Sequence, residues 1–271
     1  MLFLRLIFCL ILSLPAQAET TLTGPLIQGG LVIGTTTPGA SVWQDDQPVL
    51  VSRDGTFLIG FDRDMPATSQ LKIRQPDGQT EYRTLPIEQR QYAIQRIQLP
   101  DHKVAPMTPQ AVRHVRRDSR LLKQARRRND DRQDFSAGFV WPATGRISGV
   151  YGSQRILNGQ KKRPHYGVDV ARPTGTPVVA PAAGIITVAE PDMFYSGGTL
   201  VIDHGHQLTS ALLHLSELSV RVGEQVQQGQ LVGRIGATGR ATGPHLDWRM
   251  KLRQHQVDPQ LLVPPMPGTT P

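Results

Sequence analysis

Short apolar segments separated by turn residues dominate the first half of the chain. Clusters of Asp, Pro and Gly lie between the segments, as is typical of turns joining antiparallel strands. Strands this short at such regular spacing predict a small β-sandwich-like domain over residues 19–100. The segments are residues 31–34, 41–43, 49–51, 56–61, 71–74 and 92–97.

The same pattern returns from about residue 139, where nearly every pair of apolar runs is separated by a Gly or Pro turn. No helical stretch of useful length interrupts it. The pattern predicts a compact antiparallel β domain over residues 139–263, and the Pro-rich residues 264–271 are expected to form a flexible tail. The chain as a whole is therefore expected to be mostly β.

Residues 101–138 differ in composition and are expected to form a linker with a basic helix. Apolar residues recur there at roughly helical spacing, which predicts an amphipathic helix. We expect this connector helix to pack its thin apolar stripe on a neighbouring domain; docking to anionic lipid or wall polymer is the alternative. The basic residues are Arg113, Arg116, Arg117, Arg120, Lys123, Arg126, Arg127 and Arg128.

Residues 1–18 have the features of a secretory signal peptide. Arg5 precedes an apolar run from Leu6 to Leu14, and Ala16 and Ala18 fit the small-x-small cleavage rule. The alternative, an uncleaved anchor helix, is disfavoured because the run is short for a bilayer span. We therefore expect a periplasmic or secreted protein with no transmembrane segment after removal of the signal.

Composition narrows the chemistry that is available. The single cysteine, Cys9, lies in the predicted signal peptide, so disulfides, thiolate catalysis and cysteine-bound zinc are excluded from the rest of the chain. The net charge of +8 favours an anionic partner. Export argues against nucleic acid, which leaves cell-wall polymers or anionic membrane surfaces.

One short motif carries the first metal-binding candidate. His165 and Asp169 are four residues apart, with Gly167 midway between them. In an extended strand these three residues share one face, and the glycine leaves the space between the two side chains open. Imidazole and carboxylate are ordinary zinc ligands, so the motif is a candidate half-site for Zn²⁺.

Two later segments carry polar groups that can complete this site. His245 and Asp247 are spaced to share one face of a strand. If their strand lies beside the one carrying His165 and Asp169, four polar groups converge. His214 stands in a third, apolar strand, where a lone histidine is usually a satisfied core residue.

Taken together, the motifs resemble those of the lysostaphin/LytM-type zinc endopeptidases, which cleave peptide cross-links of bacterial peptidoglycan. The resemblance covers about residues 139–260 and does not extend to the N-terminal half. It implies a lysostaphin-like antiparallel β-sheet domain. The matching motifs are His165-x-Gly167-x-Asp169, His214-Leu215-Ser216 and Thr238-Gly239-x-x-Thr242-Gly243-Pro244-His245-Leu246.

The resemblance also implies residue roles. It gives His165 and Asp169 as zinc ligands and places Asp247 at the third ligand position, where the family usually has histidine. Two carboxylates offset the charge of the ion, which is expected to weaken its Lewis acidity. His214 and His245 would flank the reacting water, one as general base and the other polarising or stabilising the oxyanion.

Two functions follow from this resemblance. The first is a secreted zinc-dependent endopeptidase that hydrolyses peptide stems or cross-bridges of peptidoglycan through a metal-activated water. The alternative is a catalytically weak or inactive LytM-type regulator that binds or activates cell-wall amidases. A third possibility is a β protein that binds anionic polymer and carries out no chemistry.

Overall fold

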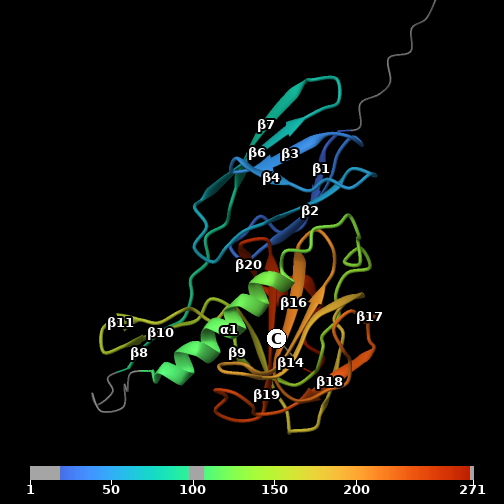
Figure 1. Ribbon diagram of the computed structural model, residues 1–271. Helices are drawn as coiled ribbons and strands as arrows, with labels where there is room; N and C mark the ends of the chain where they lie inside the picture. Colours follow the sequence, from blue (N-terminus) through green and yellow to red (C-terminus); the bar gives the residue numbers. More distant parts are fainter. Residues whose placement is uncertain (1–18, 98–106, 269–271) are drawn as a thin grey trace, which may run out of the picture.

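The computed structural model describes residues 19–97 and 107–268 (Figure 1). The predicted signal peptide, residues 98–106, which include the start of the predicted linker, and the last three residues lie outside the described residues. Within the described ranges, no helix has the length and apolar character of a membrane span. The chain is mostly β, as expected from its pattern.

The first seven strands form two sheets that share one core. A two-residue turn at Asp45 and Asp46 joins β3 to β4, and both residues have positive φ angles (47° and 62°), as a tight hairpin turn requires. Core side chains come from both sheets, including Phe57 and Leu71. One sheet contains β1 (Thr21–Thr23), β2 (Leu31–Thr35) and β5 (Thr56–Gly60); the other contains β3 (Ser41–Gln44), β4 (Gln47–Val49), β6 (Thr68–Arg74) and β7 (Thr80–Pro86).

A ten-stranded sheet forms most of the C-terminal half, and all of its strand pairs are antiparallel. Seven of its strands follow the order β17-β14-β15-β16-β19-β12-β9. Of the other three, β18 pairs with β16 and β13, and β20 pairs with β19. The strands are β9 (Arg146–Gly149), β12 (Gly167–Ala171), β13 (Pro177–Val179), β14 (Gly184–Met193), β15 (Gly197–Asp203), β16 (Leu208–Leu218), β17 (Gln225–Val226), β18 (Leu231–Ile235), β19 (His245–Leu252) and β20 (His255–Val257).

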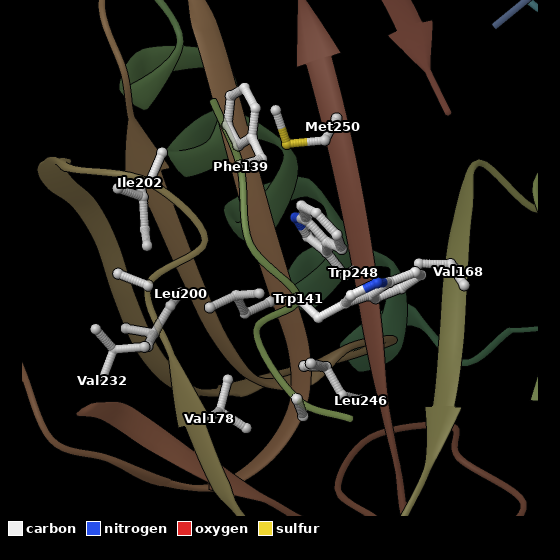
Figure 2. Packing of buried hydrophobic residues seen from close by; sticks show 14 of the residues in the cluster. Phe139, Trp141, Val168, Val178, Leu200, Ile202, Val232, Leu246, Trp248 and Met250 are labelled. Atoms are coloured by element: carbon white, nitrogen blue, oxygen red, sulfur yellow. The ribbon is translucent and has the colours of Figure 1, made fainter. Parts of the chain in front are cut away.

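Alternation along β19 gives this strand one apolar and one polar face. Leu246, Trp248 and Met250 are fully buried and point into the largest core, where Trp248 meets Trp141 edge to face at 5.8 Å (Figure 2). The intervening residues of β19 face the opposite side. Each large apolar side chain buried in this way contributes about 1.5–3 kcal/mol.

The first residues of the expected tail, from Pro264 to Met266, pack on the C-terminal domain. Trp141 donates its indole N–H to the carbonyl of Pro264, and Met266 is 4% exposed within the large core. The expectation of a flexible tail from residue 264 is therefore wrong for these residues, because the indole N–H needs an acceptor when buried. A short 3₁₀ helix (Pro259–Leu262), capped by the Asp258 side chain, leads into this segment.

A third, small sheet links the two halves of the chain. It contains β8 (Ile94–Ile97), β10 (Gln154–Leu157) and β11 (Gln160–Lys161). β8 runs parallel to β10 and is not paired with the first seven strands. The last strand expected for the N-terminal domain thus belongs to a sheet built with the C-terminal half.

The basic helix is present as α1 (Pro109–Ala125), with the Thr108 side chain accepting from the N–H of Ala111 at its start. Its apolar residues Leu121, Leu122 and Ala125 pack on side chains of β14, β15 and β16. Ion pairing between Arg117 and Glu190 adds to this contact. This packing is what the connector interpretation of the helix predicts.

Contacts between the two halves are extensive and partly buried. Leu31 and Leu58 of the N-terminal sheets belong to the large C-terminal core. Arg63 donates to the carbonyl of Gly152 at 2.7 Å, and Arg253 donates to the carbonyl of Leu58 at 3.0 Å. The N-terminal sheets therefore sit directly on the C-terminal domain (Figure 1).

Acid is expected to destabilise the fold through His204, which is fully buried. Its Nδ1 lies 2.6 Å from the carbonyl of Ala183 and its Nε2 lies 2.8 Å from the Ser210 hydroxyl. Burial lowers the pKa of His204 to about 4. Because the unfolded chain binds the proton near pH 6.5, this contribution is complete above that pH and is lost as the pH falls toward 4.

Chemical denaturation at two pH values tests this expectation. Between pH 7 and pH 5, His204 alone should lower the free energy of unfolding by about 2 kcal/mol. His204→Asn retains a donor toward Ala183 but has no titrating ring, so its free energy of unfolding should fall less over this interval. Equal pH dependence in the two proteins would contradict the prediction.

Candidate metal centre

Strand pairing brings the predicted ligands together. β12 pairs with β19 so that Asp169 lies directly opposite Asp247, and β16 places Leu213 opposite Asp247 on the other side. His165 lies two residues before β12 and turns its ring toward the two carboxylates. The two motif strands are therefore neighbours, which is the condition under which the polar groups of both motifs converge.

Gly167 leaves the space that the motif predicts. A Cβ atom at this position would lie 2.7 Å from Asp247 Oδ1 and 2.5 Å from the carbonyl oxygen of Trp248. Real Cβ atoms do not approach so closely, and the second contact is with backbone, which cannot move aside cheaply. Glycine is therefore required for Asp247 to occupy its place beside β12.

Three donor atoms from His165, Asp169 and Asp247 face one another. His165 Nε2 lies 3.0 Å from Asp169 Oδ1 and 3.6 Å from Asp247 Oδ2, and all three ligand atoms lie within 4.8 Å of one another. Donors around a tetrahedral zinc ion lie roughly 3.3 Å apart, given bond lengths of about 2.0–2.1 Å. The spacing therefore fits a zinc ion.

Two of these atoms lack hydrogen bonds. His165 Nε2 and Asp169 Oδ1 are buried, and neither makes a hydrogen bond within the described part of the chain, although they are close to each other. Buried polar atoms normally have hydrogen-bond partners, so two neighbouring buried atoms without one indicate that a ligand binds between them. A cation between them satisfies both.

The three histidines of the site share one orientation. In each, Nδ1 faces a backbone carbonyl, which can only accept, so Nδ1 carries a proton, and Nε2 is the nitrogen that can bind a metal ion or exchange a proton. This tautomer is the one that a metal ligand or a proton acceptor at Nε2 requires. The contacts are His165 with Val150 at 3.3 Å, His214 with Thr238 at 2.9 Å and His245 with Gly243 at 2.8 Å.

The charges around His165 favour a cation. Burial opposes protonation of the ring, but the carboxylates of Asp169 and Asp247 outweigh it and raise the pKa of His165 to about 10. Without metal, the His165 ring is protonated and its charge is balanced by the two carboxylates. Metal binding therefore has to displace this proton, which makes affinity depend on pH.

Arg249 is a charged neighbour that sequence reasoning missed. It lies two residues after Asp247 on the same strand face, and its Nη2 donates to Asp247 Oδ2 at 2.6 Å while its Nε reaches both carboxylate oxygens at 3.0 Å. Burial works against ionisation of Asp247, yet Arg249 holds the pKa of this carboxyl well below its usual range. The i, i+2 spacing of Asp247 and Arg249 was the available signal.

This ion pair changes the charge balance expected at the site. Two carboxylates alone cancel a divalent ion, whereas Arg249 returns one positive charge beside Asp247. The formal charge of one zinc ion together with Asp169, Asp247 and Arg249 therefore equals that of a zinc ion bound by two neutral ligands and one carboxylate. The Asp247–Arg249 pair thus occupies the place of a neutral third ligand.

His214 and His245 lie together beside the candidate ligands. Their ring centres are 4.7 Å apart, and His245 Nε2 is 3.9 Å from Asp169 Oδ1. Burial lowers the pKa of His214, so its ring is neutral at neutral pH. His214 also has a φ of 65°, an unusual backbone conformation for a histidine that is often found at functional sites.

Thr238 fixes the conformation of His214. Its carbonyl accepts from the His214 ring, and its hydroxyl donates to Leu215 while accepting from the N–H of Gly198. The remaining histidines of the C-terminal half, His204, His206 and His255, are buried away from this cluster.

Comparisons with known proteins agree with this geometry. Residues 163–259 match the model of peptidase family M23. Peptidoglycan DD-endopeptidase ShyA of Vibrio cholerae is 36% identical over 127 residues, which cover 46% of this chain and 29% of ShyA. DD-carboxypeptidase/endopeptidase Mpg of Neisseria meningitidis is 36% identical over 125 residues, with the same coverage.

A solved structure matches more of the chain. A putative peptidase M23 from Pseudomonas aeruginosa superposes with a TM-score of 0.66 at 28% identity and covers 87% of this chain and 93% of its own. The chain spans less than a third of the length of the curated relatives named above. The match to peptidase family M23, a family of zinc metallopeptidases, is confined to the C-terminal domain at residues 163–259.

Proposed function

We propose that this chain is a zinc-dependent endopeptidase that hydrolyses peptide cross-links of bacterial peptidoglycan. The observation that carries the proposal is the convergence of the buried, unbonded His165 Nε2 and Asp169 Oδ1 with Asp247 beside two further histidines. The relatives named as peptidoglycan DD-endopeptidases support the substrate class. Action on peptidoglycan, together with the predicted signal peptide, supports a periplasmic or secreted location.

In this proposal His165, Asp169 and Asp247 hold the zinc ion. When bound, zinc supplies a Lewis acid that activates water and polarises the peptide carbonyl. Asp247 is kept ionised and in place by Arg249, and His165 presents Nε2 because Val150 occupies its other nitrogen. The positions of these two ligand side chains are thus fixed by the protein before zinc binds.

His214 and His245 move and hold protons in this scheme. His214 is neutral at neutral pH and has a free Nε2, so it can accept a proton from the attacking water and later donate it to the leaving amine. His245 lies within 3.9 Å of Asp169 and has its own free Nε2 facing the site. It is placed to orient the water or to stabilise the developing oxyanion.

Digestion of purified peptidoglycan tests the proposal. The chain without its predicted signal peptide, loaded with one equivalent of zinc, should convert cross-linked muropeptide dimers to monomers, as followed by mass spectrometry. The chelated protein is the matched control and should leave the dimers intact. Unchanged dimers with the zinc-loaded protein would overturn the proposal.

The same assay addresses the regulator alternative. A protein that only activates amidases would leave dimers intact and would increase the release of stem peptides from glycan when a cell-wall amidase is added. The structure gives this alternative less support, because every one of the five expected positions carries a side chain able to play its role. A site that has lost its catalytic function would more often contain side chains that cannot bind a metal ion or transfer a proton.

A further inference from the structure

Three cationic side chains gather beside the candidate metal centre, and none of them forms a salt bridge in the described part of the chain. Arg126 follows the last residue of α1, Arg163 lies two residues before His165, and Lys251 lies near the end of β19. Arg163 approaches the ring of Tyr166 at 5.9 Å. Within the described ranges, no carboxylate pairs with any of the three.

The positive charges are close enough to affect one another. Burial lowers the pKa of Arg126, and the charges of Arg249 and Arg163 lower it further. Burial and the charges of Arg126 and Arg163 likewise lower the pKa of Lys251, and the charge of Asp62 offsets part of this effect. Arg126 Nε is also buried and makes no hydrogen bond in the described part of the chain. Such an arrangement is unfavourable unless an anion joins it.

A pocket of about 480 Å³ opens at this place between the two halves of the chain, and Arg163, Tyr166 and Lys251 line one side of it. Its other side is formed by residues 62–66 of the N-terminal domain. The acids among them are already engaged: Asp62 accepts from His255 and from the N–H of Gln256.

Asp64, the second acid of the pocket, is paired with its neighbour Arg63. An anion entering the pocket would therefore meet Arg163 and Lys251 as its free partners. The pocket is open to ligands and lies at the seam of two domains, a common place for small-molecule sites.

The strand fixes the distance from the metal centre. Asp247, Arg249 and Lys251 alternate along one face of β19, the face that α1 also covers. At about 3.3 Å per residue, Lys251 lies roughly 13 Å along the strand from Asp247. An extended peptide covers this span with three to four residues, which is the length of one stem peptide.

We propose that Arg126, Arg163 and Lys251 form a subsite that binds a free carboxylate of a stem peptide whose cross-link lies at the metal centre. The subsite rests on the proposed function and specifies its substrate as an acidic peptide. It also gives α1 a role, because the end of the helix carries one of the three cations.

Paired substrates and variants test the subsite. Arg126→Gln with Lys251→Gln should raise KM for a cross-linked stem peptide with free carboxylates by roughly tenfold or more, the ratio expected for one lost hydrogen bond to a charged group. kcat should stay near the wild-type value. Arg120→Gln removes the same charge from an exposed position of α1 and should leave KM unchanged.

Amidation of the substrate gives the complementary measurement. The wild type should lose affinity when every carboxylate of the peptide is amidated, and the double variant should no longer distinguish the two peptides. Equal KM values for both peptides with the wild type, or a double variant that retains the preference, would overturn the subsite.

A binding measurement separates the subsite from the proposed function. Calorimetric titration of the zinc-loaded His214→Asn variant with an acidic stem tetrapeptide requires no cleavage. Binding that weakens on amidation and on the Arg126 and Lys251 substitutions supports the subsite even if no peptidoglycan is hydrolysed. No binding of the acidic peptide to a folded, zinc-loaded protein would overturn it.

Discussion

Replacing Asp247 with alanine is expected to remove zinc from the protein and to lower hydrolysis of peptidoglycan by more than about 100-fold. Loss of an outer partner of a metal ligand alone costs about 10–100-fold, and Asp247 contributes a proposed ligand atom itself. The substitution also leaves Arg249 half-buried without its carboxylate. Elemental analysis of the dialysed protein, together with the muropeptide digest, measures both effects.

Asp247→His is the matched control for this prediction. Histidine restores a nitrogen ligand at the same position, so the variant should retain close to one zinc ion per chain, although Arg249 then lacks its ion pair. Circular dichroism separates loss of metal from loss of fold. A well-folded Asp247→Ala protein that keeps full zinc occupancy would contradict the assignment of Asp247 as a ligand.

Replacing His214 with asparagine is expected to lower kcat by about 10²–10⁴-fold, the usual contribution of a general acid or base. Asparagine tolerates the positive φ of this position better than most residues do, so the backbone should keep its conformation. His214 does not belong to the proposed ligand group, and zinc content should therefore remain near the wild-type value.

His245→Gln provides a second test of the same assignment. It should also retain zinc and lose activity, since His245 Nε2 lies 3.9 Å from Asp169 Oδ1 but His245 is not among the three proposed ligands. The His214→Asn result would contradict the proposal if kcat stayed within a fewfold of wild type. Loss of zinc together with activity would instead assign a ligand role to the histidine.

Much of the sheet could be predicted from local pattern. The spacing of His245 and Asp247 predicted a strand, and the structure buries Leu246, Trp248 and Met250 on its other face, as alternation requires. Local pattern did not predict which strands pair with one another. β8 pairs with β10 rather than with the N-terminal sheets, because the choice of a neighbouring strand depends on how distant segments pack and not on local period.

The candidate site was predictable where motif spacing determines geometry. His165, Asp169 and Asp247 converge because two strands are in register, as the paired motifs indicated. Arg249 and the cations beside it were not predicted, since charged residues on strands usually face solvent and nothing local distinguishes an ion pair at a metal site. The packing of Pro264 and Met266 likewise involves a distant segment, since Trp141 donates its indole N–H to Pro264 and shares a core with Met266.

The parallel pairing of β8 with β10 has a consequence for how the chain can be divided. Residues 94–97 and 154–157 close a loop that contains α1, so the helix is tethered at both ends. A fragment cut to residues 139–263 would leave the N–H and C=O groups of β10 unpaired along one side. Such a bare edge invites intermolecular strand pairing, so the excised domain is expected to aggregate where the intact chain does not.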